Sequence, residues 1–71
     1  MRKFTVILMR PDYLAEEFGK DNCIAHVRAQ DHEQAVRFAQ ADVDIADGHA
    51  AQDTEDYYPL AVFPGHIESL I

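Results

Sequence analysis

The sequence predicts a small α+β domain of ββαβ order, with a three-stranded mixed sheet and one helix packed on one face. Two β-rich segments precede a capped amphipathic helix, a third follows it, and no linker or repeat interrupts the 71 residues. A single domain spanning residues 1–71 is therefore expected. A chain this short buries only about 60% of its unfolded surface, so association with another chain is one way for it to gain stability.

The first strand is expected over residues 3–10, KFTVILMR, which are rich in β-branched and large apolar side chains. Both faces of this strand are largely apolar, which indicates a central strand that is covered on both sides. Pro11 ends it. The side chains alternate between two faces, with Phe4, Val6 and Leu8 on one and Thr5, Ile7 and Met9 on the other.

A connection with one helical turn over Tyr13–Phe18 leads to the second strand. This connection either folds back over a sheet edge or presents Tyr13 and Phe18 to a partner. The second strand, residues 23–29, alternates between small apolar and larger polar side chains, as a half-exposed edge strand does. One side carries Cys23, Ala25, Val27 and Ala29, and the other carries Ile24, His26 and Arg28.

The helix is expected to begin after Asp31, an N-cap residue followed three positions later by Gln34 in a capping-box arrangement, and to end before Gly48. Phe38 and Ile45 form a second stripe on its flank, with Phe38 half exposed. At about 100° per residue, one arc forms the core stripe. It contains Ala35, Val36, Ala39, Val43 and Ala46.

The third strand is expected within residues 57–64, YYPLAVFP, at an edge because Pro59 cannot donate a ladder hydrogen bond. A right-handed crossover would make the second and third strands parallel, with the first between them in the order 2-1-3. A turn and a short apolar tail close the chain. The alternation predicts Tyr58, Leu60 and Val62 on one face and Pro59, Ala61 and Phe63 on the other.

One helix covers only one face of such a sheet, so the other face is expected to be bare. An exposed apolar patch of this kind usually marks an interface, which predicts a homodimer or a face for another protein. His26 beside Arg28 is the pair of interest on this face, since a histidine at an interface can titrate near neutral pH. The predicted interface residues are Ile7, Met9, Ile24, His26, Arg28 and Phe63, with Thr5 beside them and Phe38 on the helix flank.

The segment DVDIADGHAAQDTED, residues 42–56, resembles a calcium loop, but its spacing is wrong for one. Its glycine is seventh where an EF-hand needs it sixth, and its twelfth residue is Asp53 where glutamate is needed. Asp42 and Asp44 would lie about 160° apart on the helix. Aspartates at a helix C-terminus also oppose its dipole, which Arg10 could offset. The predicted acidic surface comprises Asp42, Asp44, Asp47, Asp53, Glu55 and Asp56.

No other pattern predicts a metal, a cofactor or catalysis. In the predicted topology His32 and His66 share one end of the sheet, and His49 and Cys23 share the other, which falls short of a zinc site. The chain has no nucleophile elbow and no glycine-rich phosphate loop. The single cysteine, Cys23, cannot form an internal disulfide, which favours a reducing compartment. We therefore expect neither an enzyme nor a cofactor.

The formal net charge of −7, from 13 acidic and 6 basic residues, disfavours direct binding to nucleic acid and allows a basic protein partner. The apolar run after Arg2 and Lys3 is too short for a secretion signal, and no segment is long enough for a membrane span. A cytoplasmic protein is expected.

These observations predict an acidic protein–protein interaction module that homodimerises through the uncovered sheet face. The ββαβ order resembles small antitoxin-like and ferredoxin-like fragments, as a likeness of fold only. Two alternatives stay open. One is an acidic inhibitor that mimics nucleic acid or acts as an antitoxin does, and the other is a protein that binds a small ligand or metal through His26 and Arg28.

Overall fold

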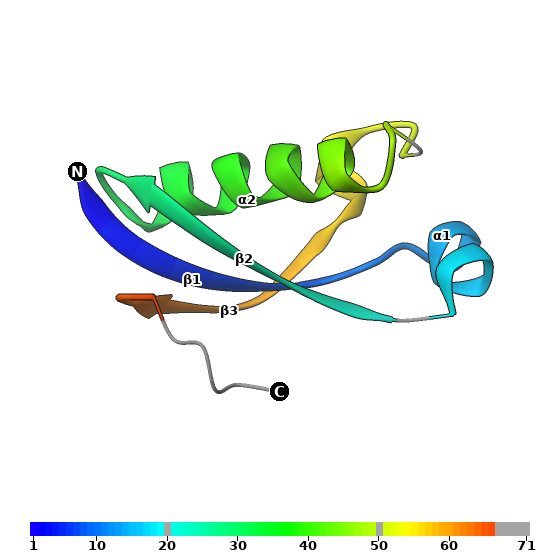
Figure 1. The fold of residues 1–71 in the computed structure, drawn as a ribbon, viewed down its shortest axis with the longest axis horizontal. Helices are drawn as coiled ribbons and strands as arrows, with labels where there is room; N and C mark the ends of the chain where they lie inside the picture. Colours follow the sequence, from blue (N-terminus) through cyan, green and yellow to red (C-terminus); the bar gives the residue numbers. More distant parts are fainter. Residues whose placement is uncertain (20, 50, 67–71) are drawn as a thin grey trace.

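The computed structural model describes residues 1–19, 21–49 and 51–66, so the apolar tail expected at 67–71 lies outside the described residues. The chain forms a three-stranded sheet with α2 along one side and α1 beyond the end of the sheet (Figure 1). The elements in chain order are β1 (Arg2–Met9), α1 (Asp12–Phe18), β2 (Asn22–Ala29), α2 (His32–Ala46), the short 3-10 helix η1 (Thr54–Asp56) and β3 (Tyr58–Pro64).

The strand order β2-β1-β3 is as predicted, but the sheet is not mixed, because both of its pairings are antiparallel. β2 and β3 do run in the same direction, since each is antiparallel to β1. They are not neighbours, so no parallel ladder forms between them. The helix-containing crossover thus spans β1, and the central position of β1 follows from its being the most apolar strand.

The predicted ββαβ order is incomplete, because the connection after β1 forms a seven-residue helix, α1, instead of a single turn. Pro11 precedes it with φ −63°, which suits a helix start, and Gly19 ends it in the left-handed conformation. Leu14 is buried and fastens α1 to the core. The side chain of Phe18, which was considered for a recognition loop, lies outside the described part of the chain.

The caps of α2 explain its boundaries. The Asp31 carboxylate accepts a hydrogen bond from the Gln34 backbone N–H at 2.8 Å, and the Gln34 side chain accepts from the N–H of Gln30, one residue earlier than in a standard capping box. At the other end Gly48 donates to the carbonyl of Ile45, and His49 donates to that of Asp44, which is a Schellman motif. Gly48 has φ +75° there, as its predicted role requires.

The core lies between α2 and the helix-facing side of the sheet. Ala35 and Ala39 of α2 and Ala29 of β2 are fully buried, so small side chains bring the helix close to the sheet. Val43 is also buried, but Ala46 is exposed, which is a correction to the predicted stripe.

A bulge in β3 reverses the predicted facing of its first residues. Val62 pairs with Val6 and Ala61 with Ile7, but Pro59 pairs with Leu8, so Leu60 is an extra residue in the ladder. Tyr57 consequently turns into the core and is fully buried, while Tyr58 and Leu60 are exposed. The predicted grouping of Tyr58 and Leu60 with Val62 is therefore wrong, because unbroken alternation cannot anticipate a one-residue insertion.

Candidate functional site

The open face of the sheet, the side away from α2, is the candidate site. Its central residues, Ile7, Ile24, Ala61 and Phe63, are half-buried, and the register places Ile24 and Ala61 on either side of Ile7. Met9 is 41% exposed at one end of the face. The predicted interface residues of the strands therefore do lie together, as an apolar strip across all three strands.

The open face differs in charge from the rest of the chain. None of the described strand residues on this face is acidic, although the protein carries 13 acidic side chains. Lys3 and Arg28, which are register partners in β1 and β2, give one end of the face a positive charge. The net charge of −7 is therefore not carried by the strand residues that the structure describes on this face.

The predicted bare face is partly covered by the chain itself. Thr5 is fully buried, and its hydroxyl donates a hydrogen bond to the carbonyl of Gly65 at 2.8 Å. The N–H of Gly65 donates to the carbonyl of Lys3 at 2.7 Å, which extends the β1–β3 pairing past Pro64. The expectation of a wholly bare face is therefore wrong at this end, because the turn after β3 reaches back over β1.

His66 completes this cover by reaching from the end of β3 to β2. Its Nε2 lies 3.1 Å from the carbonyl oxygen of Val27, and its ring centre lies 5.4 Å from that of His26. The sequence pattern paired His26 with Arg28 and placed His66 with His32 at one end of the sheet. The two histidines do share that end, because the ring centre of His32 lies 5.1 Å from that of Phe4, which pairs with Val27 and Pro64. The contact between His26 and His66 was not predicted.

A second group of polar residues joins the end of α2 to the end of β1. Arg10 forms two hydrogen bonds with Asp47, both of 3.1 Å, in a bidentate ion pair whose side chains are 12% and 6% exposed. Tyr57 donates its hydroxyl to the same carboxylate at 2.8 Å. The predicted approach of Arg10 to this helix end is confirmed, and the pair lies largely out of water.

These contacts change the ionisation of all three groups. The Arg10 guanidinium holds the pKa of Asp47 below its ordinary value, although burial opposes this shift. Asp47 in turn raises the pKa of Arg10. Burial, followed by the hydrogen bond to Asp47, raises the pKa of Tyr57. Asp47 therefore stays ionised and Tyr57 stays neutral throughout the physiological range, as the network requires.

The predicted acidic surface is wrong for Asp44 and Asp47, whose side chains are only 11% and 6% exposed. Asp44 accepts a hydrogen bond from the N–H of Ala51 at 3.3 Å, and its other carboxylate oxygen lies 3.2 Å from Nδ1 of His49. Gln40 is buried beside it and donates to the carbonyl of Tyr57. These side chains hold the loop between α2 and β3 against the helix.

Two further acidic residues, Asp53 and Asp56, form hydrogen bonds within the loop between α2 and β3 or with α1. Asp53 caps η1 by accepting from the N–H of Glu55, and Asp56 accepts the hydroxyl hydrogen of Tyr13 at 2.6 Å. That hydroxyl also accepts from the N–H of Gln52, so Tyr13 ties α1 to this loop. Asp42 and Glu55 are exposed. Much of the acidic stretch is therefore engaged with the protein's own chain.

Phe38 does not join the open face, because α2 packs on the opposite side of the sheet. It is 40% exposed, in agreement with its predicted half exposure, and Ile45 on the same flank is 61% exposed. A single continuous interface could not contain both Phe38 and Ile7.

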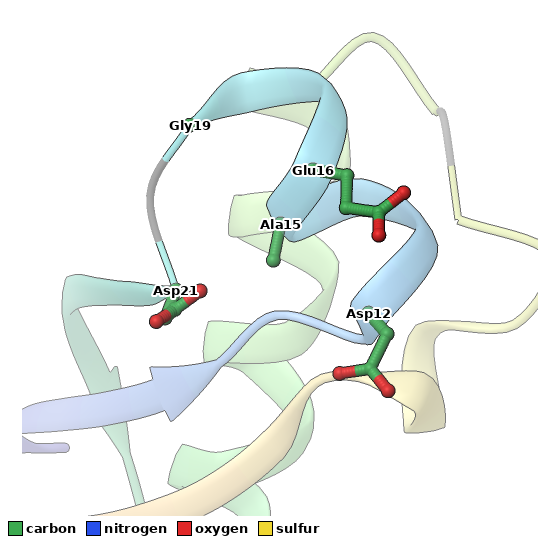
Figure 2. Close-up of a pocket in the computed structure, with 5 residues that line it drawn as sticks. All are labelled: Asp12, Ala15, Glu16, Gly19 and Asp21. Carbon is green, nitrogen blue, oxygen red and sulfur yellow. The ribbon is translucent and has the colours of Figure 1, made fainter.

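A shallow depression of about 400 Å³ lies against α1. Its three carboxylates point in different directions and do not converge on one point (Figure 2). It therefore lacks the geometry that an oxygen-binding cation needs. The lining residues are Asp12, Ala15, Glu16, Gly19 and Asp21.

Cys23 is the single thiol of the chain and is not activated as a nucleophile. Cys23 is half-buried, and burial raises the pKa of its thiol, which disfavours the nucleophilic thiolate. Its Sγ lies 3.6 Å from the carbonyl oxygen of Leu8. Within residues 1–19, 21–49 and 51–66, no three or more His, Cys, Asp or Glu side chains are grouped so that they could hold a metal ion.

Apart from the approach of Arg10, the sequence did not predict the polar network at the end of α2, although the spacing of its residues on the helix was visible. Gln40, Asp44 and Asp47 recur at i, i+4 and i+7, which places them on one side of a helix. This polar stripe adjoins the apolar one. Such a stripe can face either water or another segment of the same chain. Here it faces the chain, because Tyr57 lies against it.

Comparison with known proteins gives no match, whether against protein-family models, curated proteins or solved structures. None of the helices in the described part of the chain combines the length and apolarity needed to cross a membrane.

Proposed function

We propose that this chain is a small cytoplasmic interaction module that forms a homodimer through the open face of its sheet. The observation that carries the proposal is the acid-free apolar strip centred on Ile7 and Ile24, on a chain whose net charge is −7. Two copies of so acidic a protein repel each other over most of their surfaces. An apolar face without acids is the place where they can approach.

A second copy is the occupant that this face fits best. Lys3 and Arg28 lie at one end of the face and Met9 lies at the other. In an isologous dimer with antiparallel faces, the cationic end of one copy meets the neutral end of its partner. The two cationic ends are thereby kept apart, while the apolar centres meet.

The size of the face sets the expected strength of association. Three strands about 4.8 Å apart, each about 25 Å long, present roughly 350 Å² in projection. Two such faces total roughly 700 Å², below the range of about 1,200–2,000 Å² that stable interfaces bury, as in weak or transient complexes. We therefore expect a dimer that dissociates in the micromolar range of concentration.

The alternative functions have less support. Nucleic-acid mimicry needs rows of free carboxylates, yet Asp44, Asp47, Asp53 and Asp56 are engaged within the chain. An antitoxin-like inhibitor would need a surface that recognises its target, and no contact or charge pattern described above favours one over the open face. Small-ligand binding through His26 and Arg28 has no comparable support, because the described contact of the His26 ring is with His66 and not with Arg28.

The test is the mass of the chain in solution, measured by light scattering and sedimentation between about 10 and 500 μM. The dimer would have a mass of about 16 kDa, twice the 8.1 kDa of one chain. Ile24→Glu places a charge beside Ile7 on the open face and should lower dimer affinity more than tenfold. Ile45→Glu, on the exposed flank of α2, is the matched control and should leave the dimer unchanged.

Two results would overturn the proposal. One is a strict monomer at 500 μM. The other is a dimer that Ile45→Glu disrupts and Ile24→Glu does not, since that would place the interface on the helix. Circular dichroism of both variants checks that the fold is retained.

A further inference from the structure

We infer that His26 and His66 form a binding site for one divalent transition-metal ion of the zinc, nickel and copper group. The two residues are 40 positions apart in sequence, on β2 and just after β3, and they meet across β1 on the open face. Imidazole nitrogen is a preferred ligand of these ions. The site is contained in one chain and is complete without the proposed dimer, which would use the same face.

The separation of the rings fits joint coordination. A metal-bound imidazole nitrogen lies about 2.0–2.1 Å from the ion, so its ring centre lies about 3.2 Å away. Two imidazoles bound at a tetrahedral angle then have centres about 5 Å apart. The ring centres of His26 and His66 are 5.4 Å apart and their planes are inclined by 59°. The separation of the rings is therefore close to the one that joint coordination requires.

The tautomer of His66 is determined by its neighbour. A carbonyl oxygen can only accept a hydrogen bond, so Nε2 of His66 must carry the hydrogen that faces Val27. In the neutral ring the lone pair is then on Nδ1, which is available to a metal ion. Metal-binding histidines commonly donate their second ring N–H to a backbone carbonyl in this way, which sets both tautomer and orientation.

The backbone around His66 is held in place before any ion binds. Gly65 receives the hydroxyl hydrogen bond of Thr5 and donates its own N–H to Lys3. His26 is in the middle of a regular β-ladder, opposite Thr5. His26 is therefore on a regular strand, and the residue before His66 is anchored through both its carbonyl and its N–H, which reduces the entropy lost on binding.

The surroundings decide which ions would bind. None of the described strand residues on this face supplies a carboxylate, so magnesium and calcium, which need oxygen ligands, are disfavoured. Lys3 and Arg28 are close enough to lower the affinity for any cation. With two imidazoles and water as ligands, affinity should increase from zinc or nickel to copper.

The experiment is a zinc titration of the full, untagged chain, followed by NMR of the histidine rings. We expect one ion per chain, with shifts in the signals of His26 and His66 and none in those of His32 and His49. His26→Ala and His66→Gln should each weaken binding at least about tenfold. Glutamine retains an N–H donor for the Val27 carbonyl but lacks the imidazole, so it separates loss of the ligand from loss of the fold.

His32→Ala and His49→Ala are the controls, and both should bind zinc as the unaltered chain does. The inference is overturned if zinc shifts all four histidines alike, or if His26→Ala and His66→Gln retain the original affinity. Magnesium provides a further check. If it displaces zinc at equal concentration, the ion is held by carboxylates and the assignment to histidine is wrong.

Discussion

The hydroxyl of Tyr57 donates a hydrogen bond to the carboxylate of Asp47, 2.8 Å away, and Arg10 binds both oxygens of that carboxylate. This one side chain thus joins the end of β1, the end of α2 and the start of β3. An aspartate at a helix C-terminus opposes the helix dipole. Here the neighbouring guanidinium offsets that cost, and the residue serves as a structural junction.

Asp47→Ala should lower the free energy of unfolding by about 3 kcal/mol, because it leaves a largely buried guanidinium and a buried hydroxyl without their acceptor. Asp42→Ala is the matched control on the same helix. Asp42 is exposed, so its removal should change stability by less than about 0.5 kcal/mol. Urea unfolding of both variants measures the difference, and equal effects would contradict the junction role.

The lowered pKa of Asp47 also predicts that the stability of the folded protein falls in acid. Its pKa in the folded state is below the ordinary value of 3.8. As the pH falls below about 4, the unfolded chain takes up this proton first, so stability falls until the pH passes the folded pKa. The Asp47→Asn variant should lack this part of the decline. Urea midpoints between pH 2 and 6 test it, and parallel curves for the two proteins would contradict it.

In alkali the corresponding group is Tyr57, whose pKa is raised above the ordinary value of 10.0. As the pH rises past about 10, the unfolded phenol ionises while the folded one stays protonated, so stability falls. Tyr57→Phe should be less stable at pH 7 by about 1 kcal/mol and should fall less steeply above pH 10. Tyrosinate absorbance during unfolding follows this ionisation directly.

The bulge at Leu60 predicts opposite outcomes for two adjacent tyrosines. Tyr57→Ala removes a fully buried ring and should cost about 4 kcal/mol, enough to unfold much of so small a domain. Tyr58→Ala removes a ring that is 60% exposed and should cost less than about 1 kcal/mol. Thermal unfolding distinguishes them. The reverse ranking would mean that β3 alternates without a bulge.

Substitution of Gly48 tests how much the left-handed backbone conformation at this position alone contributes to stability. A Cβ at this position would meet nothing within 4 Å, but φ is +75°. Gly48→Ala should therefore cost about 1 kcal/mol through strain and not through a clash. A chemically synthesised chain with D-alanine at this position should be at least as stable as the glycine form, since D residues favour positive φ. If both alanine forms are equally destabilised, strain is not the cause.

Local sequence was sufficient for the elements with strong local signals. The boundaries of α2 depend on neighbouring residues, since Asp31 caps its start and Gly48 follows its end. The alternation of β2 is equally local, with Ala25 and Val27 buried and His26 and Arg28 exposed. The order 2-1-3 followed from the apolar character of β1. The extent of α1 was underestimated because its short sequence has little helical periodicity.

The sequence by itself determined the α+β class, the strand order, the boundaries of α2 and the strip of apolar residues on the open face, because periodicity and capping act over a few residues. Tertiary structure decided the bulge at Leu60, the burial of Asp44 and Asp47, and the meeting of His26 with His66. Each of these depends on a contact between segments distant in sequence. Asp47 faces Arg10 and Tyr57 and not water because the fold brings these two residues to the end of α2, and the residues next to Asp47 in sequence do not determine that.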